Sequence, residues 1–403
     1  MPAIEPFDIA SPGFKANPYP TYARLREEAP VYRASLGGRR GAWLLARYDQ
    51  VDALLRDPRF AKNPAGARGE GGRGDAPWMP GFLRPLTRNM LDLDAPDHTR
   101  LRALVQKAFT PRMIQALRPR IESLADELLA RLRPGGRIEL VSGLALPIPL
   151  TIIAELLGVP AADQQRFHRW TTRIVSASRP SDVLAVLPAV WSLFRYLRRL
   201  FARRRAEPRD DLVTALVQAE EAGDRLSEDE LLGMVFLLLA AGHETTVNLI
   251  AGAALELVRH PAQAEALRRD PDGIKTAVEE LARFTSPVEL ATERYAREDL
   301  ELEGVRIRRG EMVLGVIGSA NRDPARFPDP DTLDLAREPN RHLAFGVGVH
   351  VCLGAPLARL ETQVALAALL RRAPGLRLAV PADALRWRRH IFLRGVRELP
   401  LVT

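Results

Sequence analysis

The chain has 403 residues, 46% of them hydrophobic, with a net charge of +8 and a single cysteine. This composition excludes a largely disordered chain and a disulfide-stabilised scaffold, and the length suits one large domain or two ordinary ones. The N-terminus lacks the basic start and apolar run of a signal peptide. The longest apolar run, Leu231–Ala241, is shorter than the ~20 residues that span a bilayer. We therefore expect a soluble cytoplasmic protein with no membrane anchor.

The positive charge raises nucleic-acid binding as an alternative. Basic residues are densest in Arg195–Arg209, where arginine side chains are interleaved with Leu197, Leu200 and Phe201 at helical spacing. Such a pattern is typical of a solvated helix face, and no nucleic-acid motif accompanies it. The charge therefore favours an acidic protein partner over nucleic acid.

Taken in chain order, the patterns predict a mainly α protein with small β-sheets. Residues 31–36 and 42–48, separated by a turn at Gly37-Gly38, predict a β-hairpin. The glycine-rich run Pro64–Pro77 is of low complexity and should be mobile, either as an idle loop or as a lid. Most of the chain from Pro96 to Leu281 reads as helices, and short strands follow near residues 300–316 and at the C-terminus.

One long helix is defined by its start signal. Ser227–Glu230 forms a capping box, which Leu226 and Leu231 complete as a hydrophobic staple. The apolar pattern then continues to His260, which predicts a helix of about 30 residues. Its middle, Ala240–Thr246, contains glycine, glutamate and threonine, which are unusual in a buried helix and indicate functional positions.

The only cysteine lies in the stretch FGVGVHVCLGAPLARLE, Phe345–Glu361. Glycines around it suit tight turns or close approach to a ligand, and from Leu357 the apolar spacing is helical. Cys352 thus precedes a helix N-terminus, where the helix dipole favours the thiolate. A thiolate held in this way is either a soft metal ligand or a nucleophile.

Three separated patterns resemble the cytochrome P-450 superfamily of haem-thiolate monooxygenases. They are the loop from Phe345 to Gly354, the stretch Ala241–Thr245, and the Glu-x-x-Arg pair Glu280 and Arg283. The resemblance covers nearly the whole chain. It implies one haem-thiolate monooxygenase domain, 1–403, with the haem between the long central helix and the cysteine loop.

The resemblance also implies roles for individual residues. Cys352 would ligate the iron of haem b, and Glu244 and Thr245 would be the catalytic acid–alcohol pair that activates dioxygen. Glu280, Arg283 and Arg337 would form a structural network. The remaining cofactor-binding residues, of which the histidines and arginines would bind the propionates, are His98, Arg102, Ala241, Gly242, Arg294, Phe345, Gly346, His350 and Gly354.

By the same resemblance, a mostly apolar pocket should bind a medium-to-large lipophilic compound typical of secondary metabolism, such as a macrolide, terpenoid, steroid or fatty acyl compound. Glu289 is the exception, and it should face solvent or a polar group of the ligand. The expected pocket residues are Met90, Leu91, Leu238, Val288, Leu290, Ile391 and Phe392.

The expected partners of this monomeric protein are a ferredoxin and an NAD(P)H-dependent ferredoxin reductase, since no redox domain is evident in the chain. An acidic ferredoxin would dock at a basic face with Arg100, Lys107 and Arg359 as candidates. Three alternatives remain open, namely a peroxide-driven peroxygenase, a non-enzymatic haem sensor, and a basic nucleic-acid-binding protein.

Overall fold

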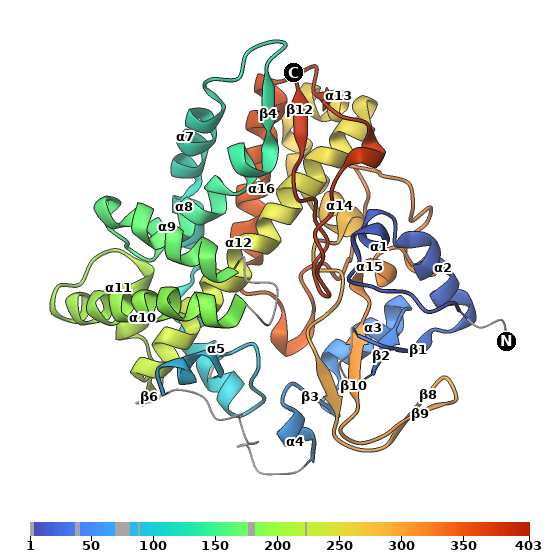
Figure 1. Cartoon of the computed structure of the whole chain (residues 1–403), viewed down its shortest axis with the longest axis horizontal. Helices are drawn as coiled ribbons and strands as arrows, with labels where there is room; N and C mark the ends of the chain where they lie inside the picture. The colour runs from blue at the N-terminus through green and yellow to red at the C-terminus, as the bar shows by residue number, and fades with distance from the viewer. Residues whose placement is uncertain (1–3, 37–40, 69–80, 88, 176–181, 222–223) are drawn as a thin grey trace. The chain divides into compact units, whose positions relative to one another are not determined.

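The computed structural model describes residues 4–36, 41–68, 81–87, 89–175, 182–221 and 224–403 (Figure 1). The chain divides into two compact units. The first contains Met1–Gly72, Arg118–Ile148 and Thr245–Thr403, and the second contains Arg73–Leu117 and Pro149–Glu244. Two helices, α8 (Pro147–Leu156) and α12 (Glu228–Arg259), contribute residues to both units.

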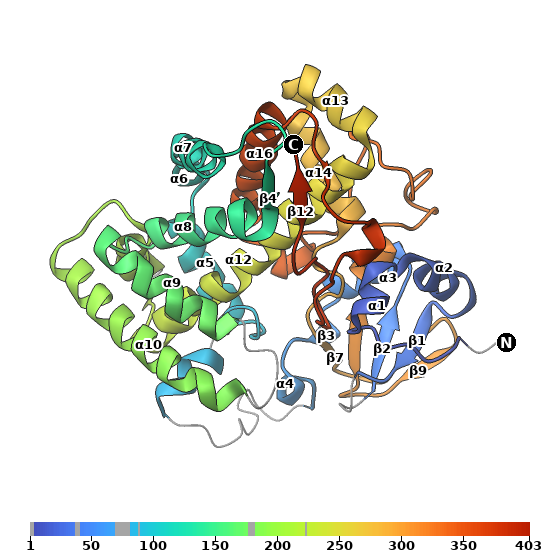
Figure 2. The same ribbon diagram turned by 45° about the horizontal axis from the view of Figure 1, so that its top comes forward.

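The first unit is built around a mixed five-stranded sheet of order β1-β2-β10-β7-β3. β1 and β2 pair antiparallel, with Val31 opposite Leu45, and β10 joins β2 in parallel. Helices α2 and α3 lie beside these strands (Figure 2). The strands of this sheet are β1 (Val31–Ala34), β2 (Ala42–Leu45), β3 (Phe60–Ala61), β7 (Arg294–Ala296) and β10 (Met312–Gly315).

Two smaller sheets contain the other strands that the structure describes in the first unit. One pairs β11 (Arg377–Leu378), β12 (Pro400–Val402) and β4 (Arg137–Glu139), and the other pairs β8 (Leu300–Leu302) with β9 (Val305–Ile307). Its remaining helices are α1 (Pro12–Ala16), α2 (Tyr19–Glu28), α3 (Tyr48–Arg56), α4 (Pro64–Arg68), α7 (Arg118–Leu129), the π-helical turn Val141–Ala145, α13 (Pro261–Arg269), α14 (Ile274–Thr285), α15 (Ile317–Ala320), α16 (Ala355–Arg372) and the 3₁₀ turns Pro271–Gly273, Gly348–His350 and Ala382–Ala384.

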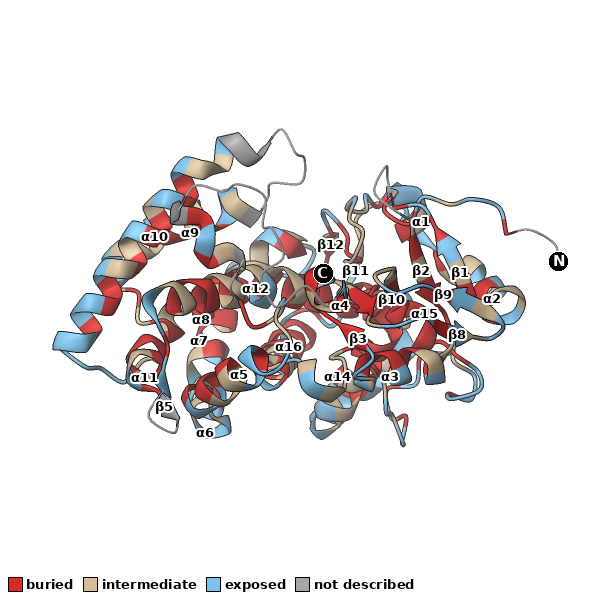
Figure 3. Ribbon diagram, turned by 90° about the horizontal axis from the view of Figure 1, so that it is seen from below, coloured by how far each residue is buried: buried red, intermediate tan, exposed pale blue. Residues whose placement is uncertain are grey.

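Over its described residues, the second unit is helical apart from the short strand pair β5–β6. Along α10 the buried side chains fall on one face and the exposed ones on the other, as Figure 3 shows. That face packs against α9 and α11. The elements of this unit are the 3₁₀ helix Gly81–Thr87, α5 (Asp97–Ala108), α6 (Pro111–Ala116), α9 (Ala161–Val175), α10 (Asp182–Ala206), α11 (Leu212–Gln218), β5 (Glu220–Glu221) and β6 (Asp224–Arg225).

The long central helix is confirmed as α12, with 32 residues and hence a length of about 48 Å at 1.5 Å per residue. Its capping box is present, because Ser227 N donates to Glu230 Oε2 at 2.8 Å and Glu230 N donates to Ser227 Oγ at 3.3 Å. In length and apolarity α12 could cross a membrane, but 56% of its most apolar window is buried inside the protein. That burial is how the core helix of a soluble protein behaves.

Of the two predictions for the N-terminal part of the chain, the hairpin is confirmed and the glycine-rich run differs from expectation. The hairpin is confirmed as β1 and β2, whereas its turn at Gly37-Gly38 lies outside the described residues. The run Pro64–Pro77 differs from expectation at its start, because Pro64–Arg68 forms helix α4 with Ala65 and Ala67 buried. Burial of these small side chains stabilises a turn of helix that the glycine-rich composition did not predict. The rest of the run lies outside the described residues.

Candidate active site

The cysteine loop is held by its own backbone. Cys352 N donates to Phe345 O at 2.9 Å, and Gly346 N donates to Leu343 O at 2.9 Å. A 3₁₀ turn, Gly348–His350, precedes the cysteine, and α16 begins three residues after it. The Cys352 thiol is exposed and lies next to the amino end of an 18-residue helix. The helix dipole therefore favours the thiolate form.

Two glycines of the loop have a backbone conformation that other residues rarely adopt. Gly346 has φ 66° and Gly348 has φ 73°. A Cβ on Gly348 would also lie 2.6 Å from Leu55 O. Sequence reasoning assigned these glycines to tight turns or close approach, and Gly348 combines both requirements.

The surface around Cys352 suits an apolar, planar ligand. Val349 and Val351 are 69% and 39% exposed, although large hydrophobic side chains elsewhere in the described residues are mostly covered. A Cβ added at Gly354 would meet nothing within 4 Å. A soft sulfur donor surrounded by exposed apolar groups and open space is the environment that a haem face requires. The residues present therefore fit a haem.

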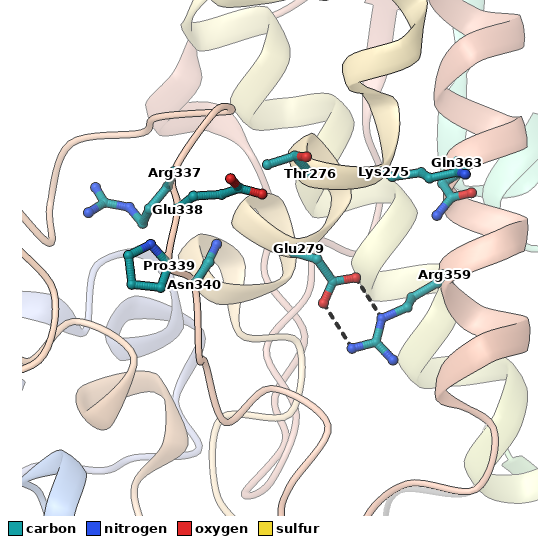
Figure 4. A pocket seen from close by; sticks show the side chains of 9 residues that line it. All are labelled: Lys275, Thr276, Glu279, Arg337, Glu338, Pro339, Asn340, Arg359 and Gln363. Carbon is teal, nitrogen blue, oxygen red and sulfur yellow. Dashed lines mark hydrogen bonds and ion pairs between the residues drawn. The ribbon is translucent and has the colours of Figure 1, made fainter.

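The Phe345 ring contacts two polar side chains, those of Arg359 and His342. The Arg359 guanidinium lies 4.2 Å from the centre of the Phe345 ring, and the His342 ring centre is 6.0 Å from it. Glu279 holds both neighbours: it accepts from Arg359 Nε at 2.6 Å and Nη2 at 2.8 Å, and it lies 3.1 Å from His342 Nε2. Figure 4 shows the Glu279–Arg359 pair.

We call these four residues, Glu279, His342, Phe345 and Arg359, the Glu279 cluster. Its hydrogen bonds and charges favour the ionised form of the Glu279 carboxyl. Burial by itself raises the pKa of the Glu279 carboxyl, but the hydrogen bonds from His342 and Arg359 and their charges outweigh it and lower the pKa to about 2. Glu279 is therefore ionised at every physiological pH. Sequence reasoning missed it, although it directly precedes Glu280 of the Glu-x-x-Arg pair.

A second network begins at Glu280, the next residue of α14. Arg283 donates to Glu280 through Nε at 2.7 Å and Nη2 at 2.8 Å, and Arg337 Nε donates to Glu280 Oε1 at 3.1 Å. Both guanidinium groups also donate to backbone carbonyls, including Asn321 O at 2.7 Å and Pro328 O at 2.7 Å. The three charged side chains are buried with these partners, so the network ties α14 to the irregular segment 321–340.

A surface cleft of about 790 Å³ lies next to both networks, between α14, α16 and residues 337–340 (Figure 4). Its lining includes Lys275, Glu279, Glu338 and Arg359. Because these side chains are charged, the cleft does not match the apolar pocket expected for a lipophilic substrate. We assign no ligand to this cleft.

The central stretch of α12 combines exposed and buried positions. Ala241 and Gly242 are exposed, Glu244 and Thr245 are half-buried, and a Cβ added at Gly242 would meet nothing within 4 Å. His243, which had no predicted role, is 6% exposed, and its Nδ1 lies 2.8 Å from Leu239 O. The helix thus presents small residues at an open surface beside an acid and an alcohol.

The expected propionate ligands are divided between the two units. Arg294 on β7 is 3% exposed and donates from Nη1 to Glu293 O at 3.2 Å, and His350 is half-buried in the 3₁₀ turn of the cysteine loop. His98, which is buried, and Arg102, which is half-buried, follow each other by one turn on α5 in the second unit.

The expected pocket residues differ in accessibility. Val288, Ile391 and Phe392 are half-buried, as are Leu91 and Leu238 in the second unit. Leu290, in contrast, has no exposed surface and belongs to an apolar core cluster, and Met90 is 7% exposed. Leu290 is covered because its backbone is bridged to Val316 and its side chain packs in the same core cluster as Leu314 and Val316.

Glu289 departs from its expected environment. It is fully buried and forms an ion pair with Lys15 of helix α1, so it faces neither solvent nor an open pocket.

Two of the predicted docking cations, Arg100 and Arg359, are paired with carboxylates. Arg100 donates to Glu230 and Asp224, and Arg359 donates to Glu279. Neighbouring carboxylates partly neutralise these guanidinium groups, which the sequence could not reveal.

Comparison with known proteins places the chain in a family. A model of the cytochrome P450 family matches residues 190–373. Cytochrome P450 107B1 of Saccharopolyspora erythraea is 46% identical over 403 residues, covering 100% of this chain and 98% of the relative. The mycinamicin IV hydroxylase/epoxidase of Micromonospora griseorubida is 45% identical over 391 residues and 94% of each chain.

A solved structure agrees with these sequence matches. The cytochrome P450 PksS of the bacillaene polyketide synthase of Bacillus subtilis superimposes with a TM-score of 0.91 at 42% identity, covering 98% of this chain and 99% of that one. Members of the family carry a cysteine-ligated haem, and Cys352 is the only cysteine that this chain offers. The chain therefore belongs to the cytochrome P450 family and is a haem-thiolate monooxygenase.

Proposed function

We propose that this monooxygenase hydroxylates or epoxidises a medium-to-large lipophilic product of secondary metabolism, with a macrolide or related polyketide as the preferred class. Two of the similar proteins are named for such compounds, the mycinamicin IV hydroxylase/epoxidase and the bacillaene polyketide synthase P450. The half-buried apolar side chains of Val288, Ile391 and Phe392 support a lipophilic ligand.

One observation carries the proposal: the sole cysteine is exposed in an apolar, glycine-shaped loop at the start of α16. When bound there, the haem supplies dioxygen binding and activation for oxygen insertion. The role of Cys352 is to hold the iron as a thiolate. Arg359 and His342 fix the Phe345 ring, which would cover one side of the sulfur once the haem covers the other.

Proton delivery is the proposed role of the acid–alcohol pair on α12. The Thr245 hydroxyl would donate a proton to the reacting oxygen, and the Glu244 carboxyl would return one to Thr245. Ala241 and Gly242, both exposed, leave room for a small molecule next to them. Arg294, His350, His98 and Arg102 would bind the haem propionates through their N–H groups.

Further parts of the proposal concern the setting of the reaction. The whole chain, 1–403, would act as one cytoplasmic monomer. Its electrons would come from a separate ferredoxin and an NAD(P)H-dependent reductase. The net charge of +8 supports an acidic electron donor, although Arg100 and Arg359 contribute little because each is paired with a carboxylate.

Turnover assays test the proposal. The haem-loaded protein is supplied with NADPH, a ferredoxin reductase and a ferredoxin, and is incubated with macrolides, terpenoids, steroids and fatty acids. We expect a product heavier by one oxygen atom, labelled from ¹⁸O₂, from at least one macrolide. Oxidation of small charged compounds alone would contradict the lipophilic substrate class. Product formed with peroxide but never with the redox proteins would contradict the proposed electron source.

A further inference from the structure

Two segments of the proposed pocket, 287–290 and 391–394, are joined to each other through their backbones. Glu289 N donates to Phe392 O at 2.8 Å, and Leu290 N donates to the same oxygen at 3.2 Å. A third backbone hydrogen bond and an isolated antiparallel bridge lie directly beside them. The two segments, with their half-buried apolar side chains, are therefore held together as one paired element.

Lys15 of helix α1 also connects the same two segments, through its side chain. Lys15 Nζ donates to Glu289 and, at 3.3 Å, to Ile391 O. The side chains of the pair are 0% and 1% exposed. Burial lowers the pKa of Lys15, and the Glu289 carboxylate opposes that effect. One ammonium group thus binds both pocket segments at once, in surroundings that exclude water.

The turn that carries the second segment is closed by a histidine. His390 Nδ1 accepts from Phe392 N at 3.0 Å and from Leu393 N at 2.9 Å. These bonds require a lone pair on Nδ1, so the ring must be neutral. Burial, together with the charges of Lys15 and Arg388, lowers the pKa of His390 to about 4 and keeps it neutral.

Other groups around the pair are already committed to partners or are uncharged. Arg394 Nε donates to Lys15 O at 2.8 Å, which fixes the lysine backbone. Burial and the neighbouring Glu289 carboxylate raise the pKa of Tyr22 well above its ordinary value, so Tyr22 stays neutral. A buried ion pair seldom adds net stability compared with apolar side chains of similar volume. Its value here is in fixing the position of what it binds.

From this geometry we infer that Lys15, Glu289 and His390 are positioning residues that set the shape of the substrate pocket without touching the substrate. The inference rests on the proposed function, because it takes residues 288 and 391–392 as pocket lining. It predicts that ligands which fill the pocket will sense the loss of this clamp (Lys15, Glu289 and His390), and that ligands which reach only the iron will not.

The test uses two iron-binding probes on the haem-loaded protein. Imidazole needs little space beyond the iron, whereas phenylimidazole also presses a ring against the pocket wall. The double variant Lys15→Met/Glu289→Gln removes both charges together and leaves no uncompensated buried ion. We expect its dissociation constant for phenylimidazole to rise by about tenfold or more, and that for imidazole to stay within about twofold of wild type.

A second pair of variants examines the turn independently. His390→Asn retains a side-chain acceptor for the Phe392 N–H group, whereas His390→Leu removes it. We expect His390→Leu to weaken phenylimidazole binding and His390→Asn to restore most of it. Arg389→Gln is the matched control, since Arg389 pairs with Asp8 at the surface and has 60% of its side chain exposed. It should leave the binding of both probes unchanged.

The outcomes separate the inference from the proposed function. Unchanged phenylimidazole affinity in the double variant and in His390→Leu would overturn the clamp. Equal weakening of imidazole and phenylimidazole would also overturn it, because that result indicates a general structural loss. If wild type itself shows no shift of its Soret band with imidazole, the proposed haem site fails instead.

Discussion

Glu279→Gln is the substitution whose effect follows most directly from the structure. The change keeps the shape of the side chain but removes the charge that holds Arg359 and His342. A pKa of about 2, compared with an ordinary value of 4.5, corresponds to about 3 kcal/mol of folding free energy at neutral pH. The two carboxylate–guanidinium side chains are 29% and 33% exposed, so solvent screening reduces the expected loss to about 2 kcal/mol.

The pH dependence gives the same prediction a second readout. Because the pKa of Glu279 is lower in the folded state, its contribution is complete above the ordinary pKa and is lost as pH falls toward 2. The difference in unfolding free energy between wild type and Glu279→Gln should therefore be constant from about pH 6 to pH 8. By about pH 3 it should have fallen to less than half.

Urea unfolding of the haem-loaded protein, followed by far-ultraviolet circular dichroism and by the Soret band, measures this difference. Glu265→Gln is the matched control, because Glu265 makes the same two-pronged pair with Arg268, at 2.7 and 2.8 Å, but at an exposed site. The control should change stability much less. Equal unfolding free energies for wild type and Glu279→Gln at pH 7 would refute the reasoning, as would a difference that grows as pH falls.

Three further predictions concern the loop, α16 and α12. Gly348→Ala should sharply reduce haem ligation in the reduced carbon monoxide spectrum, because its Cβ would lie 2.6 Å from Leu55 O, whereas Gly273→Ala should not. Burial raises the pKa of Glu361 on α16 to about 8, so the free energy of unfolding of wild type should fall from about pH 5 to pH 8. Glu361→Gln should abolish this fall and raise the free energy of unfolding at pH 8 by about 4 kcal/mol, as urea unfolding measures. Thr245→Ala and Glu244→Gln should bind haem normally but divert reducing equivalents to peroxide, measured as peroxide formed per NADPH; tight coupling in both would remove the pair from the mechanism.

Local patterns predicted the elements whose signals lie close together in the sequence. The capping box at Ser227–Glu230 determines where α12 begins, and the runs 31–36 and 42–48 flank a Gly-Gly pair, as the strands of a hairpin do. The cysteine loop was equally evident, since its glycines and the following helix lie within one stretch. These features depend on neighbours along the chain, which a single sequence displays.

Contacts between distant segments were not predictable in the same way. Lys15 and Glu289 are 274 positions apart, and no local pattern indicates that they pair. Glu289 was therefore expected to face solvent or a ligand. Similarly, Arg359 was a reasonable docking cation until its partner Glu279, 80 positions away, was seen. A charged side chain in a sequence does not reveal whether folding provides it with an opposite charge.

The central claim, that Cys352 is the thiolate ligand of a haem, is tested most directly by one spectrum. Haem-loaded wild type and Cys352→Ala are reduced under carbon monoxide, and their Soret bands are compared. We predict a strongly red-shifted band in wild type and its complete loss in Cys352→Ala, because the chain has no second cysteine to replace the ligand. A red-shifted band that persists in Cys352→Ala, or that is absent from haem-loaded wild type, would contradict the claim.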